Sequence, residues 1–309
     1  MNLIYDVQEG IEGIPKKNNT THLYQDLLKK SIYQIELEFK NKNIKFNSTI
    51  LDNNKFEGWL EKVNFPQNYN KYHNSFVKAY RDIFEKNKVK GNPFQKVYQK
   101  YFEQYIATKV MLSTEMNGVM DIACDKCPFV SYAADLYGAK NVIAQDLTSV
   151  PKKHDYLNSN KNVKVIICNA TNIPLDNDSL DFICLLNSWE HFQAPADFDV
   201  LKESLRLLRP NGKLLIIPLN LFSKSFVSTD PSCWENKQVY KKGQQPSFRR
   251  NIPVNLSKNK QVYAQCHSPK LIEIFLDNLQ GFSCEINKYS IDDSKYKIEP
   301  YLGIIFQKQ

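Results

Sequence analysis

Two hydrophobic patterns divide the chain near residue 115. Before it, apolar side chains recur at helical spacing; after it, short and nearly continuous apolar runs alternate with helical stripes. Such runs are typical of parallel strands that are covered on both faces. The alternation therefore predicts a doubly wound α/β sheet, with its first five strands at 118–123, 141–146, 163–168, 180–187 and 213–220.

Helices are predicted between these strands by their apolar stripes and end signals. One runs from Pro128 to Tyr137 and stops at Gly138, and another spans 196–208. A further helix at 268–279 and two final strands, near 282–289 and 301–307, complete the pattern. We expect a seven-stranded mixed sheet whose last strand is antiparallel.

The N-terminal third is patterned differently. Aromatic stripes predict helices at 72–84 and from Asn92 to Ile106, the second with Pro93 in its first turn. A short helix is expected around 23–28, and alternation over 35–46 indicates a hairpin. We therefore predict a mainly helical extension over 1–110 and an α/β domain over 111–309. A polar stretch at 221–267 is an insert in that domain.

Composition narrows the class of protein. The sequence contains no run of eighteen apolar residues, so no membrane span is predicted. The N-terminus also lacks the layout of a signal peptide. A cytoplasmic protein is therefore expected. The seven cysteines predict buried thiols and no disulfide framework. Residues 1–110 hold 18 Lys and Arg against 12 Asp and Glu, so they carry +6 of the net charge of +8. A solvated surface explains this excess better than an anionic partner such as nucleic acid.

Candidate chemistry lies directly after the strands, because open α/β sheets bind ligands beyond the carboxyl ends of their strands. Asp121 to Cys127 follow the first strand and Asp146 closes the second, where a carboxylate suits a ribose diol. Asn169 and Ala170 follow the third strand, and Asn187 to His191 follow the fourth. The sequence therefore predicts one ligand site along this edge.

These segments resemble the motifs of class I S-adenosylmethionine (SAM) dependent methyltransferases, in their order and spacing. The resemblance covers about residues 95–309 and includes Leu-Leu-Arg-Pro-Asn-Gly-Lys at 207–213. It is closer to type-11 homologues associated with bacterial surface-polysaccharide clusters, through Gln145-Asp146 and Trp-Glu-His-Phe at 189–192. It implies a Rossmann-like sheet, SAM as cofactor, and contacts to the cofactor from Asp121, Ala123, Cys124, Asp125, Asp146, Asn169, Ala170 and Asn187.

The first motif departs from the glycine-rich pattern of the family. Its glycine positions hold Ala123, Asp125 and Cys127, although glycine is what readily permits a positive φ and a close approach to a ligand. Asp125 also brings a negative charge, which Lys126 beside it can offset. Two interpretations stay open: a methyltransferase, or a non-catalytic methyltransferase-like protein that binds a ligand or partner with an altered loop.

The resemblance implies O-methylation of a sugar, a nucleotide-linked sugar or another small polar acceptor. His191 is the candidate general base or acceptor-positioning group, with Glu190 assisting, since histidine titrates in the useful range. A purely structural histidine is equally compatible with the sequence. Arg249 and Arg250 in the insert are candidates for binding an anionic acceptor group. Cys124-x-x-Cys127 lacks two further ligands, so no metal site is predicted. A nucleic-acid methyltransferase is disfavoured because the Asn/Asp-Pro-Pro-Tyr motif is absent.

Overall fold

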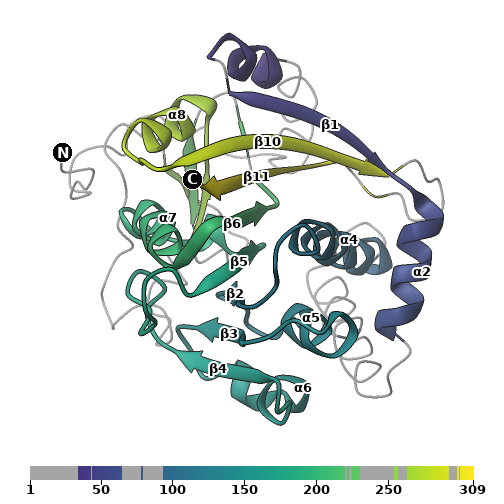
Figure 1. Ribbon diagram of the computed structural model, residues 1–309. Helices are drawn as coiled ribbons and strands as arrows, with labels where there is room; N and C mark the ends of the chain where they lie inside the picture. Colours follow the sequence, from purple (N-terminus) through teal and green to yellow (C-terminus); the bar gives the residue numbers. More distant parts are fainter. Residues whose placement is uncertain are drawn as a thin grey trace.

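The computed structural model shows a central eight-stranded sheet with helices on both faces (Figure 1). It describes residues 34–42, 44–64, 78, 93–219, 221–222, 225–229, 254–256, 263–291, 298 and 300–309. The predicted helices at 23–28 and 72–84 lie outside these residues, apart from residue 78. No helix among the described residues is both long and apolar enough to cross a membrane.

Four parallel strands and their helices carry the first half of the sheet. The elements are β2 (Val119–Ile122), α5 (Phe129–Tyr137), β3 (Val142–Asp146), η1 (Pro151–Lys153), α6 (Asp155–Asn158), β4 (Val163–Ile167) and β5 (Leu180–Leu186). The ends of the four strands agree with the predicted ends to within about two residues. β2 pairs with β3 on one side and with β5 on the other, so the strand order reverses at β2.

The second half of the sheet adds the antiparallel strand that was expected. It contains η2 (Trp189–His191), α7 (Ala196–Leu207), β6 (Leu208–Ile217), α8 (Pro269–Asp277), β10 (Phe282–Ile291) and β11 (Tyr301–Lys308). β11 lies antiparallel between β6 and β10, and the full order is β1-β10-β11-β6-β5-β2-β3-β4. The seven strands from β10 to β4 confirm the predicted mixed sheet, and β1 (Lys45–Leu51) adds an eighth.

The predicted hairpin over 35–46 is wrong. Residues 34–41 are helical, and β1 pairs in parallel with β10 at the edge of the sheet (Figure 1). Ile35 and Phe39 are four residues apart, so a helix places both on one face, where both are fully buried. Leu37 lies between them and is exposed. The apolar alternation that indicated a strand was therefore one helical face with an exposed leucine beside it.

Helix α2 (Asn53–Asn64) was not predicted, whereas α4 (Pro93–Met111) was. The backbone N–H of Lys55 donates to the side chain of Asp52 just before α2, which caps its first turn. Phe56, Trp59 and Val63 then form a buried stripe against α4.

Two apolar clusters lie on the two faces of the sheet. α2, α4 and α5 contribute to one cluster, and α7, α8 and residues 34–41 contribute to the other. Although α4 belongs largely to the predicted N-terminal extension, it packs against β5 and β6. The division at residue 110 stays a prediction.

The insert contains three short strands among the described residues. β7 (Phe226–Thr229) pairs in parallel with β8 (Val254–Leu256) and antiparallel with β9 (Ala264–Cys266). Arg249 and Arg250 lie outside the described residues, so their assignment to an acceptor site stays a prediction. The part of the insert next to β9 bears on the site through Tyr263.

Candidate functional site

The predicted site residues that the structure describes lie at the carboxyl ends of β2, β3, β4 and β5. β2 and β5 are neighbours and their onward connections run to opposite sides, which makes the crevice beyond their ends the switch point of the sheet. The loop after β2 begins at Ala123, and η2 begins two residues after Asn187. A ligand bound at the switch point therefore lies between these two segments.

The loop after β2 has the backbone shape of a glycine loop without the glycines. Ala123 has φ 54° and Asp125 has φ 48°, in the left-handed region that side chains with a Cβ rarely adopt. Hydrogen bonds from the loop to the end of β3 hold this shape. The N–H of Ala123 donates to Gln145 Oε1 at 3.1 Å, and the N–H of Asp125 donates to Asp146 Oδ2 at 2.9 Å. The replaced glycine positions thus keep a conformation that exposes backbone to a ligand.

Asp146 is nearly buried and accepts three hydrogen bonds from the chain. Oδ2 accepts from the N–H of Asp125, while Oδ1 accepts from the N–H and the hydroxyl of Thr148 at 2.7 and 2.8 Å. A carboxylate has about four acceptor positions, so one position remains, on Oδ2. In this structure Asp146 therefore has room for one further hydroxyl donor, whereas the sequence argument assigned it a whole diol.

Gln145 contributes to the family resemblance, but the sequence analysis assigned it no role at the site. Its side chain is buried, and its amide accepts from the N–H of Ala123 and donates to the carbonyl of Cys168 at 2.7 Å. It therefore ties the loop after β2 to the end of β4. The available signal was a polar amide inside the otherwise apolar run Val142-Ile-Ala before Asp146.

The segment after β4 presents a polar turn beside exposed apolar side chains. Asn169 Oδ1 accepts from the N–H of Thr171 at 3.0 Å, and Ala170 is buried below it. Leu147, which follows Asp146, is 60% exposed, and Ile167 at the end of β4 is also exposed. Because Asp146 pairs with Ile167 across the two strands, the exposed apolar side chains lie beside the polar turn.

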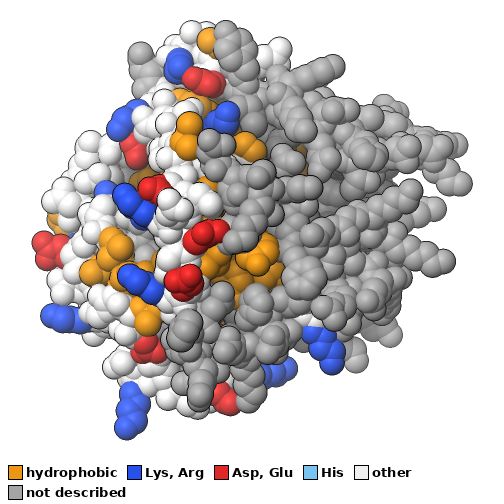
Figure 2. Space-filling model, turned by 90° about the vertical axis from the view of Figure 1, so that its right-hand side faces the viewer, with side chains coloured by type: hydrophobic (Ala, Val, Ile, Leu, Met, Phe, Trp, Pro, Cys, Tyr) orange, Lys and Arg blue, Asp and Glu red, His pale blue; other side chains and the backbone are white. Residues whose placement is uncertain are grey.

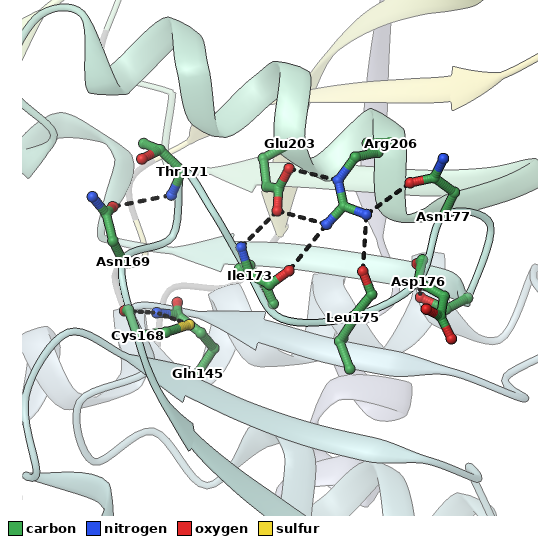
Figure 3. A network of polar contacts seen from close by, with 11 residues as sticks. Gln145, Cys168, Asn169, Thr171, Ile173, Leu175, Asp176, Asn177, Glu203 and Arg206 are labelled. Carbon is green, nitrogen blue, oxygen red and sulfur yellow. Dashed lines mark hydrogen bonds and ion pairs between the residues drawn. The ribbon is translucent and has the colours of Figure 1, made fainter.

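A polar network on α7 anchors the rest of this segment (Figure 3). Arg206 donates to the carbonyls of Ile173 and Leu175 and to the side chain of Asn177, and it forms an ion pair with Glu203. Burial works to raise the pKa of Glu203, but hydrogen bonds from Arg206 and from the N–H of Ile173 outweigh it and hold that pKa below its ordinary value. The network fixes the far end of the segment that begins at Asn169.

The segment after β5 is held rigidly by buried contacts. Asn187 has φ 54° and its N–H donates to the carbonyl of Ile217. Trp189 donates through Nε1 to the carbonyl of Asp197 at 2.8 Å and stacks on His267 with ring centroids 4.0 Å apart. These contacts determine where Glu190 and His191 lie.

The two ring nitrogens of His191 have different neighbours: Nδ1 contacts a backbone carbonyl, and Nε2 faces Glu190. Nδ1 lies 2.6 Å from the carbonyl oxygen of Tyr263. A carbonyl only accepts, so the contact assigns the proton of the neutral ring to Nδ1 and leaves a lone pair on Nε2. Nε2 lies 4.0 Å from Glu190 Oε1, and the His191 side chain is 49% exposed. The arrangement is that of an oriented histidine that can take up a proton.

Asp121 lies behind the loop, with no exposed surface. Burial raises its pKa to about 8, against a smaller lowering by the thiols of Cys127 and Cys184. The group is therefore largely a neutral acid at pH 7. A direct contact from Asp121 to a cofactor stays a prediction, and in this structure its side chain faces the thiols.

The Cys124-x-x-Cys127 pair forms a turn in which the N–H of Cys127 donates to the carbonyl of Cys124. Burial raises the pKa of both thiols well above the ordinary value. Low thiolate content makes a thiol unreactive. Among the described residues, no group of three or more His, Cys, Asp or Glu side chains is placed to hold a metal ion.

Two open grooves lie elsewhere, and none of the candidate cofactor-binding or catalytic residues lines them. One, of about 680 Å³, is lined by residues at the amino ends of β3 and β4, including Lys140, Lys161 and Lys164. The other, of about 740 Å³, borders residues 112–117 and 209–212. On the face shown in Figure 2, the described Lys and Arg side chains are scattered, and acidic side chains lie along one side of an exposed apolar group.

Comparison with known proteins agrees with the motifs. Residues 120–216, which run from β2 to β6, match the family model described as a methyltransferase domain. The strand order is that of the Rossmann-like methyltransferase sheet, extended at one edge by β1. No curated protein matches the chain.

Solved structures with a similar arrangement share little sequence with the chain. PH0226 protein from Pyrococcus horikoshii is 18% identical, with a TM-score of 0.43 over 68% of this chain and 91% of that one. The 1,6-didemethyltoxoflavin-N1-methyltransferase of Burkholderia thailandensis, solved with S-adenosylhomocysteine, is 15% identical, with a TM-score of 0.44 over 77% and 87%. A SAM-dependent methyltransferase of Thermotoga maritima is 15% identical, with a TM-score of 0.40 over 76% and 96%.

Proposed function

We propose that the protein is a SAM-dependent methyltransferase that methylates a hydroxyl group of a sugar or another small polar acceptor. The observation that carries the proposal is the loop after β2. It keeps positive φ at Ala123 and Asp125, and hydrogen bonds fix it to Gln145 and Asp146. A loop that had lost its ligand would have no need to retain two strained residues at the switch point of the sheet.

The residues at the strand ends suit the parts of the donor. Asp146 has one acceptor position for a ribose hydroxyl. Leu147 and Ile167 offer exposed apolar surface for a flat base, beside the polar turn at Asn169 and Ala170. Cys124 and Asn187 lie in the two segments that flank the crevice. When bound, SAM supplies an electrophilic methyl group on a sulfonium.

His191 suits a proton acceptor for the reaction. Its Nδ1–H is held by the carbonyl of Tyr263, so the Nε2 lone pair is free to receive the hydroxyl proton as the oxygen attacks the methyl carbon. The sulfur–methyl bond breaks, and its electron pair returns to sulfur. Glu190 Oε1, 4.0 Å from Nε2, then stabilises the imidazolium. A general base of this kind typically contributes about 10² to 10⁴ in rate.

The acceptor class and the pathway rest on the resemblance of Gln145-Asp146 and residues 189–192 to the polysaccharide-associated subgroup. We place the reaction in bacterial surface-polysaccharide synthesis in the cytoplasm, with a free or nucleotide-linked sugar as acceptor. Arg249 and Arg250 are proposed to bind an anionic group of such an acceptor.

One observation favours a second candidate, a methyltransferase-like protein that binds without catalysing. Asp125 brings a carboxylate into the loop, and its contact with Lys126 is long, at 3.8 Å. A negative charge there opposes the carboxylate of the methionine part of SAM. Calorimetry of the full chain with SAM and with S-adenosylhomocysteine tests both candidates. Saturable binding of both supports the methyltransferase, whereas binding of neither supports the second candidate.

A further inference from the structure

Glu190 is a buried acid without a full set of partners. Its side chain is 10% exposed, and Oε2 is fully buried with no hydrogen-bond partner in the described part of the chain. Its ion-pair contact among these residues is the one with His191, at 4.0 Å. Most buried polar atoms are hydrogen-bonded, and an uncompensated buried charge is strongly destabilising. A bound ligand with positive charge would supply what Glu190 lacks.

A second buried carboxyl, Glu103 on α4, acts on the same region. Its two oxygens each lie 3.1 Å from the ammonium of Lys100. Burial raises the pKa of Glu103 to about 7, Lys100 opposes this rise, and the charge of Glu190 adds to it. Since Lys100 is engaged by Glu103, it does not neutralise Glu190. Glu103 therefore keeps Lys100 engaged, and among the described residues the unpaired negative charge of this part of the site is that of Glu190.

This negative charge lies close to the switch point of the sheet, where the ligand would bind. Glu190 follows β5, and the loop Ala123–Cys127 follows β2 on the neighbouring strand. The charge of Glu103 also acts on Cys127 in that loop, and the charge of Glu190 acts on Cys266 of β9. Glu190 thus follows the strand next to the one that carries the donor loop, and its charge reaches the insert strand β9.

We propose that Glu190, assisted by Glu103, binds the positively charged sulfonium end of the donor and makes the site prefer the cationic donor over its neutral thioether product. The inference rests on the proposed function. A fixed carboxylate in a poorly solvated site attracts a nearby cation strongly, and a neutral thioether lacks that attraction.

Glu190 also stabilises the positive charge that His191 carries after methyl transfer. The methyl carbon leaves sulfur for the acceptor oxygen, the bonding pair stays on sulfur, and the hydroxyl proton passes to His191 Nε2. The positive charge thereby moves from the sulfur to the imidazolium, 4.0 Å from Glu190 Oε1. Glu190 keeps a cationic partner throughout, while the product loses its electrostatic hold and leaves more readily.

Calorimetric titration of the full chain with SAM and with S-adenosylhomocysteine tests this inference. The wild type should bind SAM at least about tenfold more tightly, equivalent to about 1.4 kcal/mol. Glu190→Gln keeps the shape of the side chain and removes its charge, so its SAM affinity should fall about tenfold while its thioether affinity hardly changes. Glu115→Gln, which removes an exposed carboxylate before β2, is the matched control and should leave the ratio unchanged.

Glu103→Gln provides a second variant in case Glu190→Gln does not fold. It should lower the SAM to thioether preference in the same direction, by a smaller factor. If the folded variants keep the wild-type ratio of SAM affinity to S-adenosylhomocysteine affinity, the inference is overturned. It is also overturned if both affinities fall equally, because Glu190 would then contact a chemical group that the two ligands have in common. If the wild type binds neither ligand, the proposed function itself fails and the inference fails with it.

Discussion

The carboxylate of Asp146 accepts a hydrogen bond of 2.9 Å from the backbone N–H of Asp125, which has φ 48°. This contact joins the end of β3 to the strained loop after β2. Asp146 therefore has two roles in the account: it holds the loop in shape, and it retains one acceptor position for the donor ribose.

Asp146→Ala should weaken SAM binding by at least about tenfold, because a hydrogen bond to a charged group contributes about 1.5–3 kcal/mol. The loop bond and the ribose bond are lost together, so the effect should exceed that of one contact. Calorimetry measures the change, with Asp277→Ala, an exposed position at the end of α8, as the control. Unchanged SAM affinity in a folded Asp146→Ala protein would remove Asp146 from the site.

Ala123→Gly should leave stability unchanged or raise it slightly. The left-handed conformation costs a non-glycine residue about 1–2 kcal/mol, and relief of that strain offsets the larger backbone entropy of glycine in the unfolded chain. Ala133→Gly, in the middle of α5, is the contrasting variant and should destabilise by about 1 kcal/mol. Urea unfolding gives both values. Equal destabilisation by the two substitutions would show that Ala123 is not strained.

His191→Ala should lower turnover by about 10² to 10⁴ and leave SAM affinity nearly intact, because Nε2 serves the acceptor. His191→Gln, which can still donate to the carbonyl of Tyr263, separates orientation from proton transfer: it should keep the fold without restoring turnover. Full activity in either variant refutes the base role. Loss of folding in both variants would assign His191 a structural role.

Stability should fall with rising pH because of Asp121. Burial raises its pKa from 3.8 to about 8 in the folded state. Between these values the folded protein holds a proton that the unfolded chain has released, so the free energy of unfolding falls as pH rises. Asp121→Asn lacks this titration, and its stability relative to wild type should rise by about 2 kcal/mol or more from pH 5 to pH 8, given about 1.4 kcal/mol per pKa unit.

Thermal or urea unfolding at several pH values checks this dependence. The exposed variant Asp277→Asn should follow the wild-type pH profile. Parallel profiles for Asp121→Asn and the wild type would contradict the buried neutral acid.

Strands with continuous apolar runs could be predicted from the sequence because both their faces are buried. β2, β3, β4 and β5 were found at nearly their observed bounds, and with them the edge that carries Asp146 and His191. β1 could not be predicted in the same way, since it is an edge strand and its burial pattern has no continuous buried run.

The roles of buried residues were harder to predict from the sequence. Glu103 lies within the aromatic stripe of α4, which the sequence assigned to packing, and only the fold brings it near enough for the charge of Glu190 to raise its pKa. Gln145 was part of the resemblance but had no assigned role, because its side-chain amide bridges two segments that are each more than twenty residues away along the chain. The hydrogen bonds of Asp146 to Asp125 and Thr148 likewise depend on the loop conformation, which the altered glycine positions concealed.

Calorimetric titration of the wild-type chain with SAM tests the central claim most directly. The loop held at positive φ by Gln145 and Asp146 predicts saturable binding at one site per chain, with S-adenosylhomocysteine competing for it. No binding of SAM by the folded protein would contradict the account and leave a methyltransferase-like fold that does not use the donor.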